Sequence, residues 1–262
     1  MKKLALALGS GGARGVAHVG FLQALEEENI PISAISGASM GAVIGSCYAS
    51  GMKAEEIREA LKEIRPRKLV DLSLLPIQKL GLLTWKKVRN LLKKYLQDKT
   101  FEDLQIPFSC VAVNLLSGKL EHLKSGSLID SVMASSSVAS IFQPVKIDDK
   151  LYTDGGILCR VPVEQAKESG ADVVVAVDIL EECPEIDKIS NIFLLLTRVF
   201  DIIESASTQR YKDGITGVCD LWLTPKMPTV NAYKFIYNEE GYQAGYQVGK
   251  ENIDKIKKLL EL

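Results

Sequence analysis

Residues 37–41 read Gly-Ala-Ser-Met-Gly, which places a serine between two glycines in the pattern G-x-S-x-G. The pattern follows a short apolar run and precedes an alanine- and glycine-rich stretch typical of a helix. A sharp turn between strand and helix exposes such a serine, and the helix N-terminus stabilises negative charge that develops beside it. Gly37, Ser39 and Gly41 therefore indicate a nucleophile elbow. The alternative is a glycine-rich turn in which Ser39 only caps the helix.

A second glycine-rich segment, Gly-Ser-Gly-Gly-Ala-Arg-Gly at residues 9–15, also lies between a predicted strand and a predicted helix. It fits a dinucleotide-binding fingerprint poorly, because Arg14 occupies the third glycine position of G-x-G-x-x-G counted from Gly9. It is not a P-loop, since neither Lys-Ser nor Lys-Thr follows the glycines. Free backbone N–H groups at a helix N-terminus can hold a phosphate or an oxyanion.

A serine nucleophile needs a base, and the chain has only two histidines, His18 and His122. His18 lies in the helix predicted after the first glycine loop, and His122 lies in an alternating stretch typical of a hairpin arm. Neither lies in a loop late in the chain, where the histidine of a G-x-S-x-G hydrolase is expected. The remaining candidate is the carboxylate of Asp154 in Tyr-Thr-Asp-Gly-Gly, at the end of a predicted strand. An Asp-Gly pair is also an ordinary turn former.

The elements that must position these residues alternate between apolar runs and amphipathic stretches. We predict strands at residues 3–8, 32–36, 108–115, 173–177 and 218–223, and helices at 15–29, 40–50, 54–64, 84–97, 163–169 and 188–210. This alternation predicts an α/β fold with a largely parallel sheet covered on both faces. Both glycine loops then lie at carboxyl ends of parallel strands, where such sheets bind ligands. No linker or repeat indicates a second domain, so residues 1–262 are expected to form one domain.

Composition excludes several classes of protein. The 262 residues carry a net charge of −1, with 25% charged residues, which excludes a dedicated nucleic-acid-binding protein. Five scattered cysteines without a C-x-x-C pair indicate reduced thiols, and two histidines cannot form a three-His zinc site. The first apolar run is too short for a signal peptide, and residues 189–203 fall short of the ~20 residues that span a bilayer. We therefore expect a cytoplasmic protein.

One region departs from the neutral overall charge, because residues 62–99 contain eleven basic and three acidic residues. Within it, one helical face is apolar and aromatic: Trp85, Val88, Leu91, Leu92, Tyr95 and Leu96. Such a helix can dock on anionic lipid, but more commonly it packs its apolar face on the core. Residues 62–100 are thus a candidate basic amphipathic lid or surface-docking insertion, with 72–83 as the lid. Residues 189–203 are expected in the core or a subunit interface, with acyl-chain binding as the alternative.

Taken together, GSGGARG, GASMG and YTDGG resemble the patatin-like phospholipase family in residue type, order and spacing. The stretch ASSSVASIFQPV at residues 134–145 is similar to a fourth segment of that family. The resemblance covers roughly residues 3–180 and is greatest to the bacterial cytosolic branch related to neuropathy target esterase. It implies a three-layer α/β/α sandwich with a mostly parallel central sheet.

The resemblance also implies a Ser39–Asp154 dyad that hydrolyses lipid esters through an acyl-enzyme, with no cofactor and no metal. The implied oxyanion hole is formed by Gly11, Gly12, Ala13 and Arg14. The elbow glycines are Gly37 and Gly41, and the turn after the base contains Gly155 and Gly156. The chain departs from the family pattern at Ser10, Ala38 and Ala139-Ser140, which affects loop geometry and substrate preference more than the dyad.

The expected partner is a lipid or other ester substrate: a phospholipid, a lysophospholipid or a short ester. An acyltransferase that uses the same acyl-enzyme is one alternative, and a non-catalytic lipid-sensing regulator is another. Peripheral contact with an anionic membrane, at its inner face, is expected if the basic helix docks on lipid. The sequence leaves the oligomeric state open.

Overall fold

The structure is a computed structural model that describes residues 2–64, 86–139, 142–180, 186, 188–190, 192–214, 217–227 and 237–262. The described strands form an eight-stranded sheet in the order β5-β6-β3-β2-β1-β7-β8, with β4 paired to β3 outside this path. Their bounds are β1 (Leu4–Leu8), β2 (Ala34–Gly37), β3 (Phe108–Asn114), β4 (Lys119–Leu123), β5 (Val145–Ile147), β6 (Lys150–Asp154), β7 (Val173–Val177) and β8 (Leu221–Leu223). Strands β3, β2, β1, β7 and β8 pair in parallel, whereas β4, β5 and β6 pair antiparallel.

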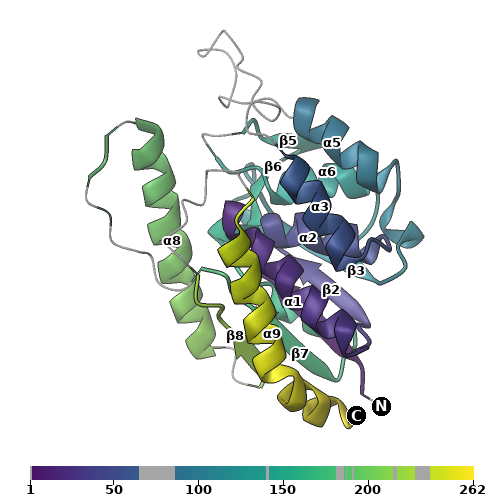
Figure 1. The fold of residues 1–262 in the computed structure, drawn as a ribbon. Coiled ribbons are helices and arrows are strands. Elements are labelled where there is room, and N and C mark those ends of the chain that lie inside the picture. The colour runs from purple at the N-terminus through teal and green to yellow at the C-terminus, as the bar shows by residue number, and fades with distance from the viewer. Residues whose placement is uncertain are drawn as a thin grey trace.

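Helices cover both faces of this sheet. Their bounds are η1 (Gly12–Gly15), α1 (Val16–Glu27), α2 (Met40–Ala49), α3 (Ala54–Glu63), α5 (Lys86–Leu96), η2 (Phe101–Asp103), α6 (Leu128–Ser135), η3 (Gly155–Ile157), α7 (Val163–Lys167), α8 (Ile192–Gly214) and α9 (Glu239–Leu260). In Figure 1, α9 lies alongside α1, and the N- and C-termini lie close together. The Lys2 N–H donates to Leu260 O at 3.2 Å, which ties the two ends to each other.

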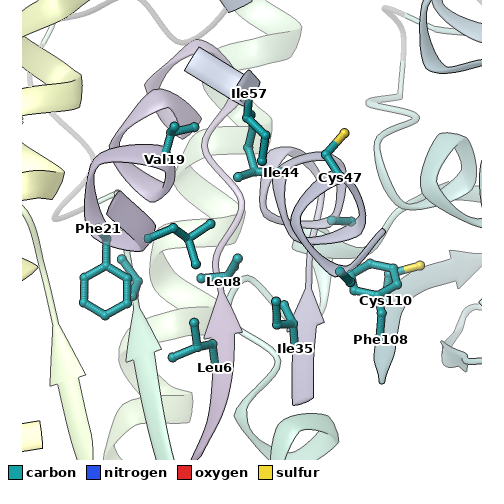
Figure 2. Packing of buried hydrophobic residues seen from close by; sticks show 14 of the residues in the cluster. Leu6, Leu8, Val19, Phe21, Ile35, Ile44, Cys47, Ile57, Phe108 and Cys110 are labelled. Carbon is teal, nitrogen blue, oxygen red and sulfur yellow. The ribbon is translucent and has the colours of Figure 1, made fainter. Parts of the chain in front are cut away.

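Strand β1 shows how the sequence produces the layers. Side chains alternate along a strand, so the leucines at its first, third and fifth positions face one way and Ala5 and Ala7 face the other. The leucines are buried with α1, α2 and α9, and the alanines are buried with Val163 and Ala166 of α7. Figure 2 shows Leu6 and Leu8 on the side of β1 that is covered by α1 and α2. This burial on both faces confirms the predicted α/β/α sandwich.

The carboxyl edge of the sheet brings the three candidate segments together. Strands β1 and β2 end side by side, with Leu8 opposite Gly37, so both glycine loops start at neighbouring positions. Cys110 of β3 also pairs with Gly37, and β3 then continues to Asn114. Strand β6 runs back along this extension, and its last residue, Asp154, pairs with Ala112. The antiparallel edge therefore returns Asp154 to the end of β2.

Most predicted elements are confirmed. The predicted strand at 173–177 coincides with β7, and the predicted helices at 40–50 and 54–64 correspond to α2 and α3 within one residue at each end. Helices α6 and α9 were not predicted. The first has only eight residues, and the second carries three glycines in its first three turns, which lower helix propensity.

The two surface expectations had different outcomes. Helix α5 packs Leu92 and Leu96 in the core while Lys93 and Lys94 are exposed, which confirms core packing of its apolar face. Trp85 and the lid at 72–83 lie outside the described residues. Residues 189–203 were expected in the core or a subunit interface, and the subunit interface and the alternative of acyl-chain binding stay predictions. Core burial is wrong for the apolar side chains of α8 that are 41–49% exposed: Leu195, Leu196, Val199, Ile202 and Ile203. Within the described residues, no helix combines the length and apolar content needed to cross a bilayer.

Candidate active site

Ser39 lies at the turn between β2 and α2, where the sequence analysis predicted an elbow. Its backbone has φ 51° and ψ −120°, a left-handed φ that costs a non-glycine residue about 1–3 kcal/mol. The glycines on either side permit the turn. A Cβ at Gly41 would overlap Leu8 O, and one at Gly37 would lie 2.6 Å from Ala42 Cα. The turn therefore requires glycine at both positions, and it presents Ser39 in a strained, nearly buried position (7% exposed).

The first glycine loop lies against this elbow. Gly11 and Gly12 both have positive φ, at 156° and 56°, and the loop leads into η1. The N–H groups of Gly11, Gly12 and Ala13 donate no hydrogen bond to any described residue, whereas the Arg14 N–H donates to Gly11 O at 3.2 Å. Gly15 at the end of the loop is so close to Met40, the residue after Ser39, that a Cβ would overlap the methionine side chain. Three consecutive amides beside the elbow thus have no acceptor among the described residues.

Asp154 is 1% exposed, and its Oδ1 accepts a hydrogen bond from the Gly156 N–H at 2.8 Å. Burial raises the pKa of Asp154 to about 7, because a buried carboxylate loses its hydration. Interaction with the Ser39 hydroxyl and with the Gly156 N–H limits this rise. The other oxygen, Oδ2, is buried without a hydrogen bond of regular geometry among the described residues. Ser39 is thus near enough to lower the pKa of Asp154 but is not aligned in a regular hydrogen bond with it, as is common in unliganded sites.

A run of three serines at the end of α6 connects Ser39 to Asp154. Ser135 Oγ accepts from the Ser39 N–H at 3.1 Å, and the Ser136 hydroxyl donates to Ser39 O at 3.2 Å. The backbone carbonyl of the next residue, Ser137, accepts from the Asp154 N–H at 2.9 Å. From the sequence, this stretch was noted only for its family likeness, and no role was predicted for it. The signal that could have found it is the serine run itself, since short hydroxyl side chains hydrogen-bond to nearby backbone.

Glu204 of α8 is the other functional candidate that the sequence analysis missed. It is 2% exposed, and the Ser10 hydroxyl donates to its Oε1. Ser10 precedes Gly11, so this carboxyl contacts the start of the first glycine loop. No short motif surrounds Glu204 in the sequence, and its position in the site depends entirely on where α8 packs.

The two histidines serve other contacts. His18 is buried in α1, its Nε2 lies 2.8 Å from Gly9 O, and burial lowers its pKa to about 4. A neutral His18 therefore supports the backbone of the first glycine loop. His122 of β4 has its Nδ1 3.0 Å from Glu168. Neither contact involves Ser39 or Asp154, so neither histidine is positioned as the base for Ser39. No cluster of three or more His, Cys, Asp or Glu side chains suited to a metal ion occurs among the described residues.

Comparisons of the sequence with known proteins agree with the fold and the motifs. An uncharacterized NTE family protein of Mycobacterium tuberculosis is 36% identical over 177 residues, which are 68% of this chain and 49% of that protein. Lysophospholipase nte1 of Aspergillus fumigatus is 29% identical over 289 residues, covering 98% of this chain and 18% of that protein. The chain thus spans about half the length, or less, of these curated relatives.

Two solved structures share the fold at low sequence identity. VipD from Legionella pneumophila aligns over 95% of this chain and 67% of that chain, with a TM-score of 0.57 and 16% identity. Human GIVD cytosolic phospholipase A2 aligns over 99% of this chain and 59% of that chain, with a TM-score of 0.52 and 10% identity.

The family model described as patatin-like phospholipase matches residues 6–167. This range holds both glycine loops, the serine run and Asp154, and it excludes α8 and α9. More than half of the chain is matched, and the chain therefore belongs to the patatin-like phospholipase family.

Proposed function

We propose that the protein is a serine acyl hydrolase of lipid esters that acts through Ser39 and Asp154. The observation that supports this most is a buried carboxyl with a pKa of about 7 beside a serine in a strained turn. A general base works best when its pKa lies near the working pH, and an exposed aspartate with a pKa near ~4 would be too weak. Family membership and the name of the fungal relative, lysophospholipase nte1, support a lipid ester as substrate.

In the first half of the reaction, Ser39 Oγ forms a bond to the ester carbonyl carbon while Asp154 accepts the hydroxyl proton. The carbonyl electron pair moves onto oxygen, and the N–H groups of Gly11, Gly12 and Ala13 hold the oxyanion. The bond to the alcohol then breaks, and the leaving oxygen takes the proton from Asp154. An acyl group remains on Ser39.

In the second half, a water molecule attacks the acyl carbon and Asp154 accepts its proton. The second tetrahedral intermediate is held by the same amides. It collapses with cleavage of the bond to Ser39 Oγ, and the proton on Asp154 returns to that oxygen. The acid product leaves, and both residues regain their starting protonation states.

Labelling and turnover test this proposal directly. Ser39→Ala should abolish labelling by a fluorophosphonate and reduce hydrolysis of lysophospholipid, phospholipid and a short ester by about a thousandfold or more. Ser46→Ala is the matched control, because Ser46 lies on α2 and bonds only its own helix, to Val43 O. Undiminished labelling of Ser39→Ala would contradict the proposal. Adding an alcohol acceptor tests for an acyltransferase, and complete failure of labelling in the unmodified protein favours a non-catalytic regulator.

We further propose that the exposed basic face of α5 makes peripheral contact with anionic lipid. Lys86, Lys93 and Lys94 are exposed there. Lys93 pairs with Asp98 at 2.9 Å, Lys94 pairs with Glu63 at 3.4 Å, and Arg89 pairs with Asp130. Charge attraction of this kind weakens with salt. Vesicles with anionic lipid should bind the protein more tightly than neutral vesicles at low salt. Equal binding to both would argue against this contact.

We propose the cytoplasm as the site of action, because reduced cysteines are usual there. The four cysteines of the described residues are unpaired, and three of them, Cys47, Cys110 and Cys159, are buried. Burial raises the pKa of the Cys47 and Cys159 thiols to about 12 and raises that of the Cys110 thiol as well, so all three stay protonated and unreactive.

A further inference from the structure

Helix α8 packs on the protein with a polar face. The side chains of Thr197, Glu204 and Thr208 are all nearly or fully buried, and they lie seven and four residues apart on one side of the helix. The hydroxyl of Thr208 is satisfied within the helix, where it donates to Glu204 O at 2.8 Å. The Glu204 carboxyl is therefore the acidic group that this buried face carries toward the site.

The carboxyl group of Glu204 lies beside Gly156, between the first glycine loop and the turn after Asp154. A Cβ added at Gly156 would lie 2.5 Å from Glu204 Oε1, 3.0 Å from Ser10 Oγ and 3.1 Å from Asp154 Oδ1. Three oxygens from three separate segments thus converge on the space beside one glycine. The Ser10 hydroxyl donates to Glu204 Oε1, and the Gly156 N–H donates to Asp154 Oδ1.

The charges around Glu204 favour its neutral form. It faces groups from several elements: Asp154 of β6, Asp201 of its own helix, Arg160 and Asp178. Arg160 forms an ion pair with Asp178 at 2.9 Å, and Lys212 lies 3.3 Å from the same carboxylate. Burial and the charge of Asp154 raise the pKa of Glu204 well above its usual value, and Arg160 only partly opposes this rise.

We propose that Glu204 is a positioning residue that holds the first glycine loop against the turn carrying Asp154. This inference rests on the proposed function, because it assigns Glu204 to the same site. Its Oε1 accepts the hydrogen bond of the Ser10 hydroxyl, and Ser10 directly precedes the amides of Gly11–Ala13. The end of Glu204 packs on Gly156, whose N–H binds Asp154. Losing this contact lets the amides and the base move relative to each other, and such displacements strongly reduce rates.

Three variants separate positioning from simple structural support. Glu204→Gln keeps the shape, the neutral charge and the acceptor for Ser10, so it should retain kcat within about threefold. Glu204→Ala removes the contact and should lower kcat by roughly 10- to 100-fold with KM changed less than about twofold. Ser10→Ala removes only the hydroxyl, and it should lower kcat by a smaller factor, which covers the case in which Glu204→Ala does not fold. Gln209→Ala, on an exposed turn of the same helix, is the matched control and should leave kcat unchanged.

Amide hydrogen exchange provides a second readout that does not depend on turnover, at the hydrogen-bonded N–H groups of Ser10, Arg14 and Gly156, which donate to Arg160 O, Gly11 O and Asp154 Oδ1. These amides should exchange at least about tenfold faster in Glu204→Ala than in the unmodified protein, and at nearly unchanged rates in Glu204→Gln and Gln209→Ala. Equal exchange in all four proteins would overturn the inference, as would a Glu204→Gln variant that loses as much kcat as Glu204→Ala. Failure of the unmodified protein to react with a fluorophosphonate would refute the proposed function instead, and the exchange rates would still decide the role of Glu204.

Discussion

The two long helices at the end of the chain, α8 and α9, pack on the protein in opposite ways. They have 23 and 22 residues, respectively. Helix α9 buries its apolar and glycine residues, among them Gly245, Ile253 and Ile256, and exposes charged ones. Helix α8 buries polar groups and exposes apolar ones, as Glu204 and Ile203 show.

This difference predicts that α9 contributes mainly to the stability of the fold and that α8 contributes mainly to the candidate site. Burial of apolar area contributes about 25 cal/mol per Å², so the face of α9 stabilises the fold. The buried face of α8 carries hydroxyls and a carboxyl, whose burial contributes little net stability, and the carboxyl, that of Glu204, contacts Ser10 of the candidate site. Figure 1 shows the two helices placed accordingly, with α9 against α1 and α8 standing at the side of the domain. Substitutions in α9 should therefore appear in stability measurements, and substitutions at the site that α8 contacts should appear in kinetics.

The largest expected effect is at the base. Asp154→Asn should reduce ester turnover by at least about a thousandfold, because the amide cannot accept the proton of Ser39. It should at the same time stabilise the protein near pH 8. The pKa of Asp154 is about 7 in the folded protein, and its ordinary value, which applies to the unfolded chain, is 3.8. The cost of ionising Asp154 to the stability of the fold is therefore absent below pH ~3.8, grows between pH ~3.8 and 7, and stays constant above 7.

Thermal unfolding of both proteins at pH 4 and pH 8, together with steady-state kinetics, checks this prediction. Relative to the unmodified protein, the unfolding free energy of the Asn variant should rise by on the order of a few kcal/mol between pH 4 and pH 8. A variant that loses turnover and is also less stable at pH 8 would show that the carboxylate supports the fold rather than the reaction.

A matched pair of isoleucines tests the two helices against each other. Ile256→Ala in α9 should cost about 2–5 kcal/mol of unfolding free energy, since Ile256 is fully buried. The same change at Ile203 in α8 should cost less than about 0.5 kcal/mol, because that side chain is 49% exposed. Denaturant unfolding of both variants gives the comparison. Equal losses would mean that α8 buries apolar surface as α9 does.

A single methyl group added at the contact between α1 and α9 should lower the stability of the protein by an intermediate amount. A Cβ at Gly245 would overlap Ala17 O, and one at Gly20 would overlap Tyr242 O, so backbone meets backbone where the helices cross. Gly245→Ala should lower stability by about 1–3 kcal/mol, because the strain of overpacking exceeds the gain in helix propensity. Gly118→Ala is a useful control for the glycine change, although its φ of 68° also carries strain. A Gly245→Ala protein with raised Tm would contradict the close packing of the two helices.

The smallest expected effect is the change of kcat/KM over one pH unit. Asp154 must be ionised to accept a proton, so kcat/KM should fall about tenfold for each pH unit below 7 and level off above it. His18, with a pKa of about 4, does not titrate in this range. Profiles of the unmodified protein and of His18→Gln should therefore show the same acid limb. A limb centred near pH 4 would mean that Asp154 is well solvated during the reaction.

The candidate site was partly predictable because its main residues lie in short motifs with local causes. The elbow at Ser39 follows from two glycines between a strand and a helix, and the turn after Asp154 follows from two more. The absence of a late histidine pointed to a carboxylate base before any contact was known. The serine run and Glu204 were not predictable as parts of the site, since their roles consist of contacts with Ser39, Asp154 and Ser10 across long sequence separations.

The sequence by itself determined the alternation of strands and helices, the two glycine loops and the family, since these depend on periodicity and short motifs. Only the tertiary structure decided that β6 returns Asp154 to the end of β2 and that burial gives this carboxyl a pKa of about 7. It also decided which face of α8 turns inward. Hydrophobicity alone predicts that a helix buries its apolar side, whereas α8 exposes Ile203 and buries Glu204, which accepts the hydroxyl of Ser10. Such contacts join residues far apart in the sequence, so the local pattern of α8 does not contain them.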